Sequence, residues 1–150
     1  MATTQFSAAR THIELLIQYN FTNPLLLEEA LLATPSMVGT SFLTEFNKRL
    51  AIVGNGAIKL LVTNDCYLAG MPKGQADLRR QAVESNSKLA KLGRAKGIDL
   101  FIVKGGGTTV SSIIMVASAV EAIFGAVFVD SKEDYGATKR AMVAFGLLED

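Results

Sequence analysis

The sequence NKRLAIVGNGAIKLLVTNDCY occupies residues 47–67 and decides the fold class, because its apolar residues recur at the spacing of an α-helix. One face of this segment carries the turn-spaced residues Leu50, Val53, Ala57, Leu60, Leu61 and Asn64. Gly54 and Gly56 lower the local helix propensity, and their lack of a side chain predicts close approach by the backbone of another helix. We therefore predict a long helix from about Asn47 to Tyr67.

Helical patterns continue on both sides of this segment. Five further stretches show helical spacing: residues 13–20, 24–33, 76–96, 112–129 and 132–145. Asn23 followed by Pro24 is typical of a helix start, because Asn caps well and Pro suits the first helical position. Residues 37–46 are predicted to form a loop. Since no segment shows sustained alternation of apolar and polar residues, we predict a single all-α domain over residues 1–150.

Composition excludes several classes of protein. The chain has 150 residues, of which 49% are hydrophobic and 19% are charged, and its net charge is +1. These values exclude a disordered chain and a polyelectrolyte tail. Cys66 is the only cysteine, which excludes an internal disulfide and a multi-cysteine zinc site. With His12 as the only histidine, a His-rich metal centre is excluded as well.

Residues 110–129 are long and apolar enough to span a bilayer. Glu121 lies in their middle, however, where an acid costs about 2.5–3.5 kcal/mol on membrane insertion. We therefore predict a buried core helix and no membrane partner. Residues 1–10 lack the order of a secretory signal, but they contain Ser, Thr and Arg without an acid, which permits an organelle presequence. The expected location is intracellular, either cytoplasmic or mitochondrial.

Charge is uneven along the chain. Residues 71–104 contain eight basic and three acidic residues, whereas the flanking regions are slightly acidic. Such a segment could follow a phosphate backbone, and the candidate RNA-binding residues are Arg79, Arg80, Lys88 and Lys91. The alternative is an ordinary solvated helix face with lysines at its surface.

Three segments are more specific than these general patterns. They are residues 17–36, 47–57 and 117–130, which read IQYNFTNPLLLEEALLATPS, NKRLAIVGNGA and ASAVEAIFGAVFVD. In this order and spacing they resemble the catalytic domain of the ribonuclease III family, and the resemblance extends over residues 13–145. It implies an all-α fold that pairs as a two-fold homodimer. It also implies Mg²⁺-dependent hydrolysis of double-stranded RNA.

The residues that carry this chemistry are largely replaced. The resemblance places acids at Lys48, Ala51 and Asn55 on one helix and at Ser118 and Glu121 on another, yet only Glu121 is acidic. Mg²⁺ prefers several hard oxygen ligands, mainly carboxylates, and no other nearby acid is an obvious substitute. We therefore name no catalytic residue and expect no cofactor. If Mg²⁺ binds at all, Asn55 and Glu121 would hold it.

A lone buried carboxylate is costly, so we predict that Lys48 or Arg49 lies toward Glu121 and fills part of the vacated cation site. The alternative is that Glu121 caps a helix or faces solvent. The resemblance also places at Ile52 a large aromatic residue that inserts into the partner subunit. Ile52 is smaller but apolar and is followed by Val53, so we expect a homodimer through a reshaped contact.

Three functions remain open from the sequence. The first is an inactive, dimeric domain that binds double-stranded or structured RNA, or acts as a scaffold in RNA processing or in a ribosome-type ribonucleoprotein. The second is an active Mg²⁺-dependent endonuclease for double-stranded RNA, working alone or with an intact partner. The third is a protein-interaction module that no longer contacts RNA.

Overall fold

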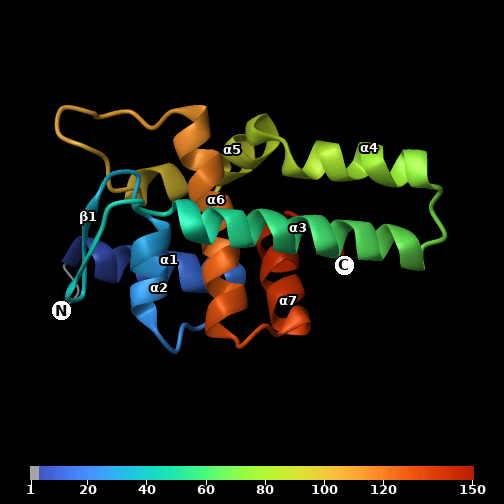
Figure 1. The fold of residues 1–150 in the computed structure, drawn as a ribbon, viewed down its shortest axis with the longest axis horizontal. Coiled ribbons are helices and arrows are strands. Elements are labelled where there is room, and N and C mark those ends of the chain that lie inside the picture. Colours follow the sequence, from blue (N-terminus) through green and yellow to red (C-terminus); the bar gives the residue numbers. More distant parts are fainter. Residues whose placement is uncertain (1–3) are drawn as a thin grey trace.

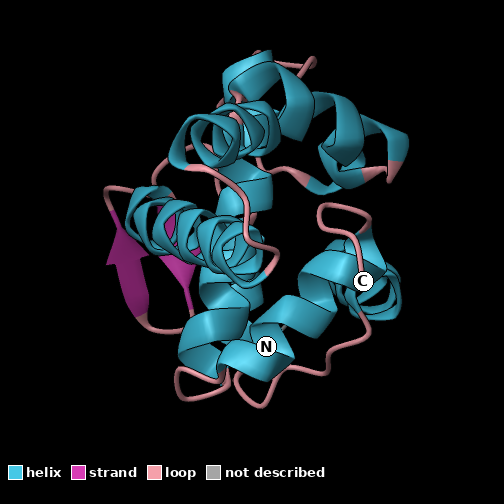
Figure 2. Ribbon diagram, turned by 90° about the vertical axis from the view of Figure 1, so that its right-hand side faces the viewer, coloured by secondary structure: helices cyan, strands magenta, loops and turns pink. Residues whose placement is uncertain are grey.

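The computed structural model describes residues 4–150, so the first three residues of the segment that permits a presequence lie outside the described part. Helices dominate the fold. Their bounds are α1 Thr4–Ile17, α2 Pro24–Ala30, α3 Lys48–Leu68, α4 Lys73–Glu84, α5 Asn86–Ala95, α6 Ile113–Asp130 and α7 Tyr135–Phe145. A 3₁₀-helix, η1, spans Ile98–Phe101, and two short strands, β1 (Ser36–Val38) and β2 (Ser41–Leu43), form a hairpin at one edge of the helical body (Figure 2). The predicted all-α fold class is confirmed.

Helix α6 is the centre of the core. It runs through the middle of the molecule and crosses α3, while α5 and α7 pack against it from other sides (Figure 1). The residues from Ala122 to Val127 are all buried, and the ring of Phe124 meets that of Phe145 edge to face at a centroid distance of 5.4 Å. Within residues 4–150, α6 alone has the length and hydropathy to cross a membrane, but most of it is buried by the protein itself.

The last residue of α6 stabilises the turn between α1 and α2 by hydrogen bonds. The carboxylate of Asp130 accepts hydrogen bonds from the Tyr19 hydroxyl at 2.7 Å and from the backbone N–H groups of Thr22 and Asn23, both at 2.8 Å. Burial and this carboxylate together raise the pKa of Tyr19 well above its ordinary value. Asn23 then caps α2 as predicted, because its side chain accepts from the N–H of Leu25.

The predicted helix over residues 76–96 is wrong in one respect, since it is two helices. Ser85 has an extended backbone, with φ −64° and ψ 143°, and its hydroxyl accepts from the N–H of Lys88. The chain therefore bends between α4 and α5. A serine at this position caps a new helix more favourably than it continues an old one.

The predicted loop over residues 37–46 contains the small hairpin instead. Met37 pairs with Phe42 and Val38 pairs with Ser41, so Gly39 and Thr40 form a two-residue turn. Gly39 has φ +60°, which glycine adopts without strain and which a tight hairpin turn requires at its first position. A glycine at the centre of this short segment was the signal for the turn.

Candidate functional site

The candidate site lies where α3 crosses α6. At this crossing a Cβ on Gly54 would overlap the carbonyl oxygen of Glu121, and a Cβ on Gly125 would overlap that of Leu50. The two helix backbones therefore touch, as the sequence predicted for Gly54. The prediction was wrong for Gly56, around which a Cβ would meet no atom within 4 Å.

This close crossing brings Asn55 and Glu121 together. The side-chain amide of Asn55 donates from Nδ2 to Oε2 of Glu121 at 2.9 Å, although 66 residues separate the two in sequence. Ala51 and Ser118 lie one turn before them on the same helices, and both are half-buried. The structure therefore brings Asn55 and Glu121 of the degenerate site together, with Ala51 and Ser118 one helical turn away on α3 and α6.

A second carboxylate, missed by the sequence analysis, lies near Glu121. Burial raises the pKa of the half-buried Glu121 carboxyl; the hydrogen bond from Asn55 lowers it, and the charge of Glu84 raises it. Glu84 is the last residue of α4. One of its oxygens pairs with Arg80, while Oε2 is buried and has no hydrogen-bond partner among the described residues. Because residues 76–96 were predicted as one helix, the sequence analysis expected no helix end at Glu84.

The predicted approach of Lys48 or Arg49 to Glu121 is wrong. The ammonium of Lys48 lies over the ring of Phe46, at 4.9 Å from its centroid. Arg49 pairs at 3.6 Å with Glu29, a carboxyl whose pKa is raised by burial and lowered by this guanidinium. Arg49 therefore interacts on the side of α3 that faces α2, while Glu84, the acid near Glu121, pairs with Arg80.

The residues at the crossing fit a divalent metal poorly. Mg²⁺ holds near-octahedral oxygen ligands and gives up water reluctantly, so it needs more than one carboxylate at close range. Across residues 4–150 no three His, Cys, Asp or Glu side chains are grouped to hold a metal ion. Asn55 also turns its N–H donor toward Glu121, so one oxygen of this carboxylate is engaged in a hydrogen bond.

Comparison with known proteins gives the family. The model of the family described as "Ribonuclease III domain" matches residues 48–132, more than half of the chain. The chain belongs to the ribonuclease III domain family. Proteins named Ribonuclease 3 are similar in sequence: the one from Idiomarina loihiensis is 32% identical over 132 residues, covering 83% of this chain and 54% of that protein. The one from Ehrlichia chaffeensis is 27% identical over 125 residues, covering 79% of this chain and 54% of that protein.

Solved structures agree on the fold of this ribonuclease III domain. The nuclease domain of ribonuclease III from Campylobacter jejuni superposes with a TM-score of 0.74 at 22% identity, covering 89% of this chain and 94% of that one. The description of that structure refers to a region involved in dimer formation. The present chain spans about half the length of the curated relatives it matches.

The predicted RNA-binding residues of the ribonuclease III domain divide into two groups. On α4, Arg79 pairs with Glu149 at 3.9 Å, and Arg80 pairs with Asp77 at 3.5 Å and with Glu84. On α5, Lys88 and Lys91 are exposed, lie three residues apart on one helix face, and form no ion pair within the described residues. The α5 lysines are therefore the better placed to meet a phosphate backbone.

The predicted dimer residues are the neighbours Ile52 and Val53. Ile52 is 74% exposed on the outer side of α3, whereas Val53 is half-buried. Leu60 and Tyr67, which lie further along the helix, are 55% and 79% exposed. Ile52, Leu60 and Tyr67 are therefore large apolar side chains exposed along α3.

Proposed function

We propose that residues 1–150 form a ribonuclease III-like domain that does not cleave RNA and that acts, as an intracellular homodimer, by binding double-stranded or structured RNA. In this role it would serve as a scaffold in RNA processing or in a ribosome-type complex. The observation that carries the proposal is the ligand set at the crossing of α3 and α6. There Glu121 pairs with an amide in place of the carboxylates that the family resemblance puts at Ala51, Asn55 and Ser118.

The remaining groups at the crossing supply too little negative charge for the reaction. Phosphodiester hydrolysis assisted by metal ions needs the ion held, a water activated and charge on the leaving oxygen neutralised. Glu84 is already neutralised on one side by Arg80, and one oxygen of Glu121 is occupied by Asn55. Both carboxylates are thus engaged in contacts within the domain.

A cleavage assay tests the inactivity. The purified chain is incubated with long duplex RNA and Mg²⁺ or Mn²⁺, and we expect no products above those of a metal-free control. The double variant Asn55→Asp/Ser118→Asp restores two acids at the crossing. We expect it to gain Mn²⁺-dependent thermal stabilisation that the unchanged chain does not show, because a ligand that binds only the folded state raises its stability. Metal-dependent cleavage by the unchanged chain would refute the proposal.

The salt dependence of binding to duplex RNA tests the proposed RNA binding. Each phosphate contact that is lost should reduce the slope of log affinity against log salt by roughly 0.7–0.9. We therefore expect Lys88→Ala/Lys91→Ala to reduce the slope by about 1.5. Lys139→Ala is the matched control, because the Lys139 ammonium pairs with Asp65 at 2.9 Å, lies outside the basic segment, and its loss should leave the slope nearly unchanged. Binding without salt dependence, or no binding, would favour the third function, a protein-interaction module.

One observation favours the alternative of an active Mg²⁺-dependent endonuclease. Glu84 supplies a second carboxylate near Glu121, and one of its oxygens has no partner among the described residues. If the chain cleaves duplex RNA, the variants Glu84→Gln and Glu121→Gln should both abolish cleavage. If only a mixture with an intact ribonuclease III domain cleaves, the present chain acts as the non-cutting half of a heterodimer.

A further inference from the structure

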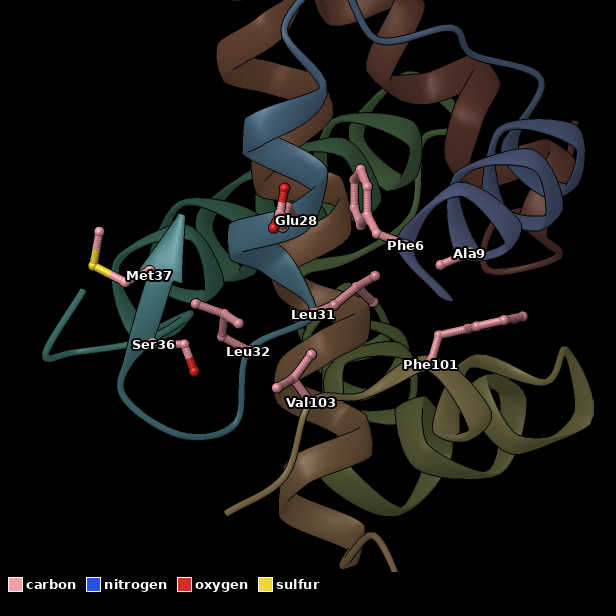
Figure 3. A pocket seen from close by; sticks show the side chains of 9 residues that line it. All are labelled: Phe6, Ala9, Glu28, Leu31, Leu32, Ser36, Met37, Phe101 and Val103. Carbon is pink, nitrogen blue, oxygen red and sulfur yellow. The ribbon is translucent and has the colours of Figure 1, made fainter. Parts of the chain in front are cut away.

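A cavity of about 230 Å³ lies between α1, α2, β1 and the segment around η1 (Figure 3). None of its lining residues belongs to the crossing of α3 and α6. Its floor is apolar and buried: Phe6 is 8% exposed, and Leu31 and Leu32 are each 2% exposed. Met37 and Val103, at 55% and 38% exposure, form an open rim.

The walls of this cavity are fixed by backbone hydrogen bonds. The N–H of Val103 donates to the carbonyl of Leu31 at 2.9 Å, and the N–H of Ala33 donates to the carbonyl of Val103 at 2.8 Å. These bonds hold the segment after η1 beside the end of α2. The wall on the opposite side belongs to the hairpin, in which Met37 pairs with Phe42. The cavity is therefore built by paired backbone and does not depend on the placement of one flexible side chain.

One charged group lines this apolar space. The carboxylate of Glu28, on α2, lies beside the cavity together with Phe6 (Figure 3). Within residues 4–150 it forms no hydrogen bond and no ion pair. Two neighbouring acids differ in this respect, because Glu14 pairs with Arg10 and Glu29 pairs with Arg49. Glu28 thus leaves a negative charge at an apolar wall with no cation to balance it.

We propose that this cavity binds a small organic amine in its protonated form, with the ammonium at Glu28 and the hydrocarbon body against the apolar floor. A cavity of roughly 150 Å³ accommodates benzene, so about 230 Å³ accommodates an aromatic ring with a short aminoalkyl chain. The aromatic side chain of Phe6 offers a ring surface that favours a cationic or aromatic ligand. A neutral ligand of the same shape would leave the charge of Glu28 unbalanced.

The test uses two probes of the same shape. The probe 2-phenylethylammonium carries the charge, and 2-phenylethanol replaces the ammonium by a hydroxyl. Methyl NMR signals of Leu31, Leu32 and Val103 report binding at the cavity. We expect the ammonium to shift these signals at concentrations up to about 10 mM and to bind about fivefold more tightly than the alcohol, as is typical of one partly exposed ion pair.

The variant Glu28→Gln should remove that fivefold preference while leaving the affinity for the alcohol unchanged. Glu133→Gln is the matched control, because Glu133 is an exposed acid in the turn before α7 and should leave both affinities unchanged. The comparison of the two probes on the unchanged chain needs no variant to fold. Equal affinities for both probes, no shift of the three methyl signals, or an equal effect of both substitutions would overturn the proposal.

Discussion

Replacing Gly54 by alanine should destabilise the domain severely, because the added methyl group has no space. Its Cβ would overlap the carbonyl oxygen of Glu121 and would lie 3.0 Å from the backbone nitrogen of Gly125. Both neighbours are backbone atoms of a buried helix, so neither can rotate away. The two helices must separate, and their buried side chains lose contact along the crossing.

The size of the effect follows from two opposing contributions. Overpacking in a core costs about 1–3 kcal/mol and occasionally more, and a clash with backbone belongs at the upper end. Alanine recovers about 0.5–1 kcal/mol through its better helix propensity. We therefore expect Gly54→Ala to lower the free energy of unfolding by about 2–3 kcal/mol, which for a chain of this length lowers the melting temperature by roughly 4–12 °C.

Gly56→Ala provides a control on the same helix. A Cβ at Gly56 would meet no atom within 4 Å, so only the propensity gain remains and the variant should be more stable by about 0.5–1 kcal/mol. Urea unfolding followed by circular dichroism measures both variants. If Gly54→Ala were as stable as the unchanged chain, or if both alanines changed stability alike, the close crossing of α3 and α6 would be wrong.

Three further predictions concern stability and assembly. Asp130→Asn should lower the free energy of unfolding in urea by about 3 kcal/mol, because three hydrogen-bond donors lose a charged acceptor. The control Asp134→Asn should change it by less than about 0.5 kcal/mol, since Asn and Asp cap helices about equally well. Because the pKa of Glu121 is raised by folding, the folded chain keeps this proton to higher pH than the unfolded chain does. This carboxyl therefore lowers the stability of the domain as the pH rises from about 4.5. Glu121→Gln should flatten that part of the curve of stability against pH. An unchanged curve would contradict the buried environment of Glu121. In sedimentation velocity, Ile52→Glu should shift the chain from dimer to monomer. The control Leu15→Glu changes a similarly exposed residue on α1 and should leave the dimer intact. An unchanged chain that sediments only as a monomer would contradict the proposed assembly.

Much of the fold could be predicted because its determinants are local. The apolar spacing of residues 47–67 is sufficient to predict α3, and Asn23 followed by Pro24 is sufficient to predict the start of α2. Errors arose where one residue type serves two purposes. Ser85 could continue a helix or cap a new one, and it caps α5. Gly39 could lie in a loop or in a hairpin turn, and the strands that flank it pair.

The candidate site was predictable only in part. The sequence shows which carboxylates of the family pattern are missing, since that requires only reading the residues at known spacing. It does not show which cation lies near which anion, because an ion pair depends on the distance between elements far apart in the chain. Arg49 was predicted to lie toward Glu121, but the packing of α2 against α3 places Glu29 within its reach instead.

The sequence by itself thus determined the helical fold class, the cap at Asn23 and the loss of acids at Lys48, Ala51, Asn55 and Ser118. Only the tertiary structure decided that Asn55 donates to Glu121, that Glu84 comes close to it, and that Glu28 has no cation beside it in an apolar cavity. The physical reason is the separation along the chain of the residues that interact. Helix propensity and capping act between residues a few positions apart, whereas burial and charge pairing depend on how separate helices pack together.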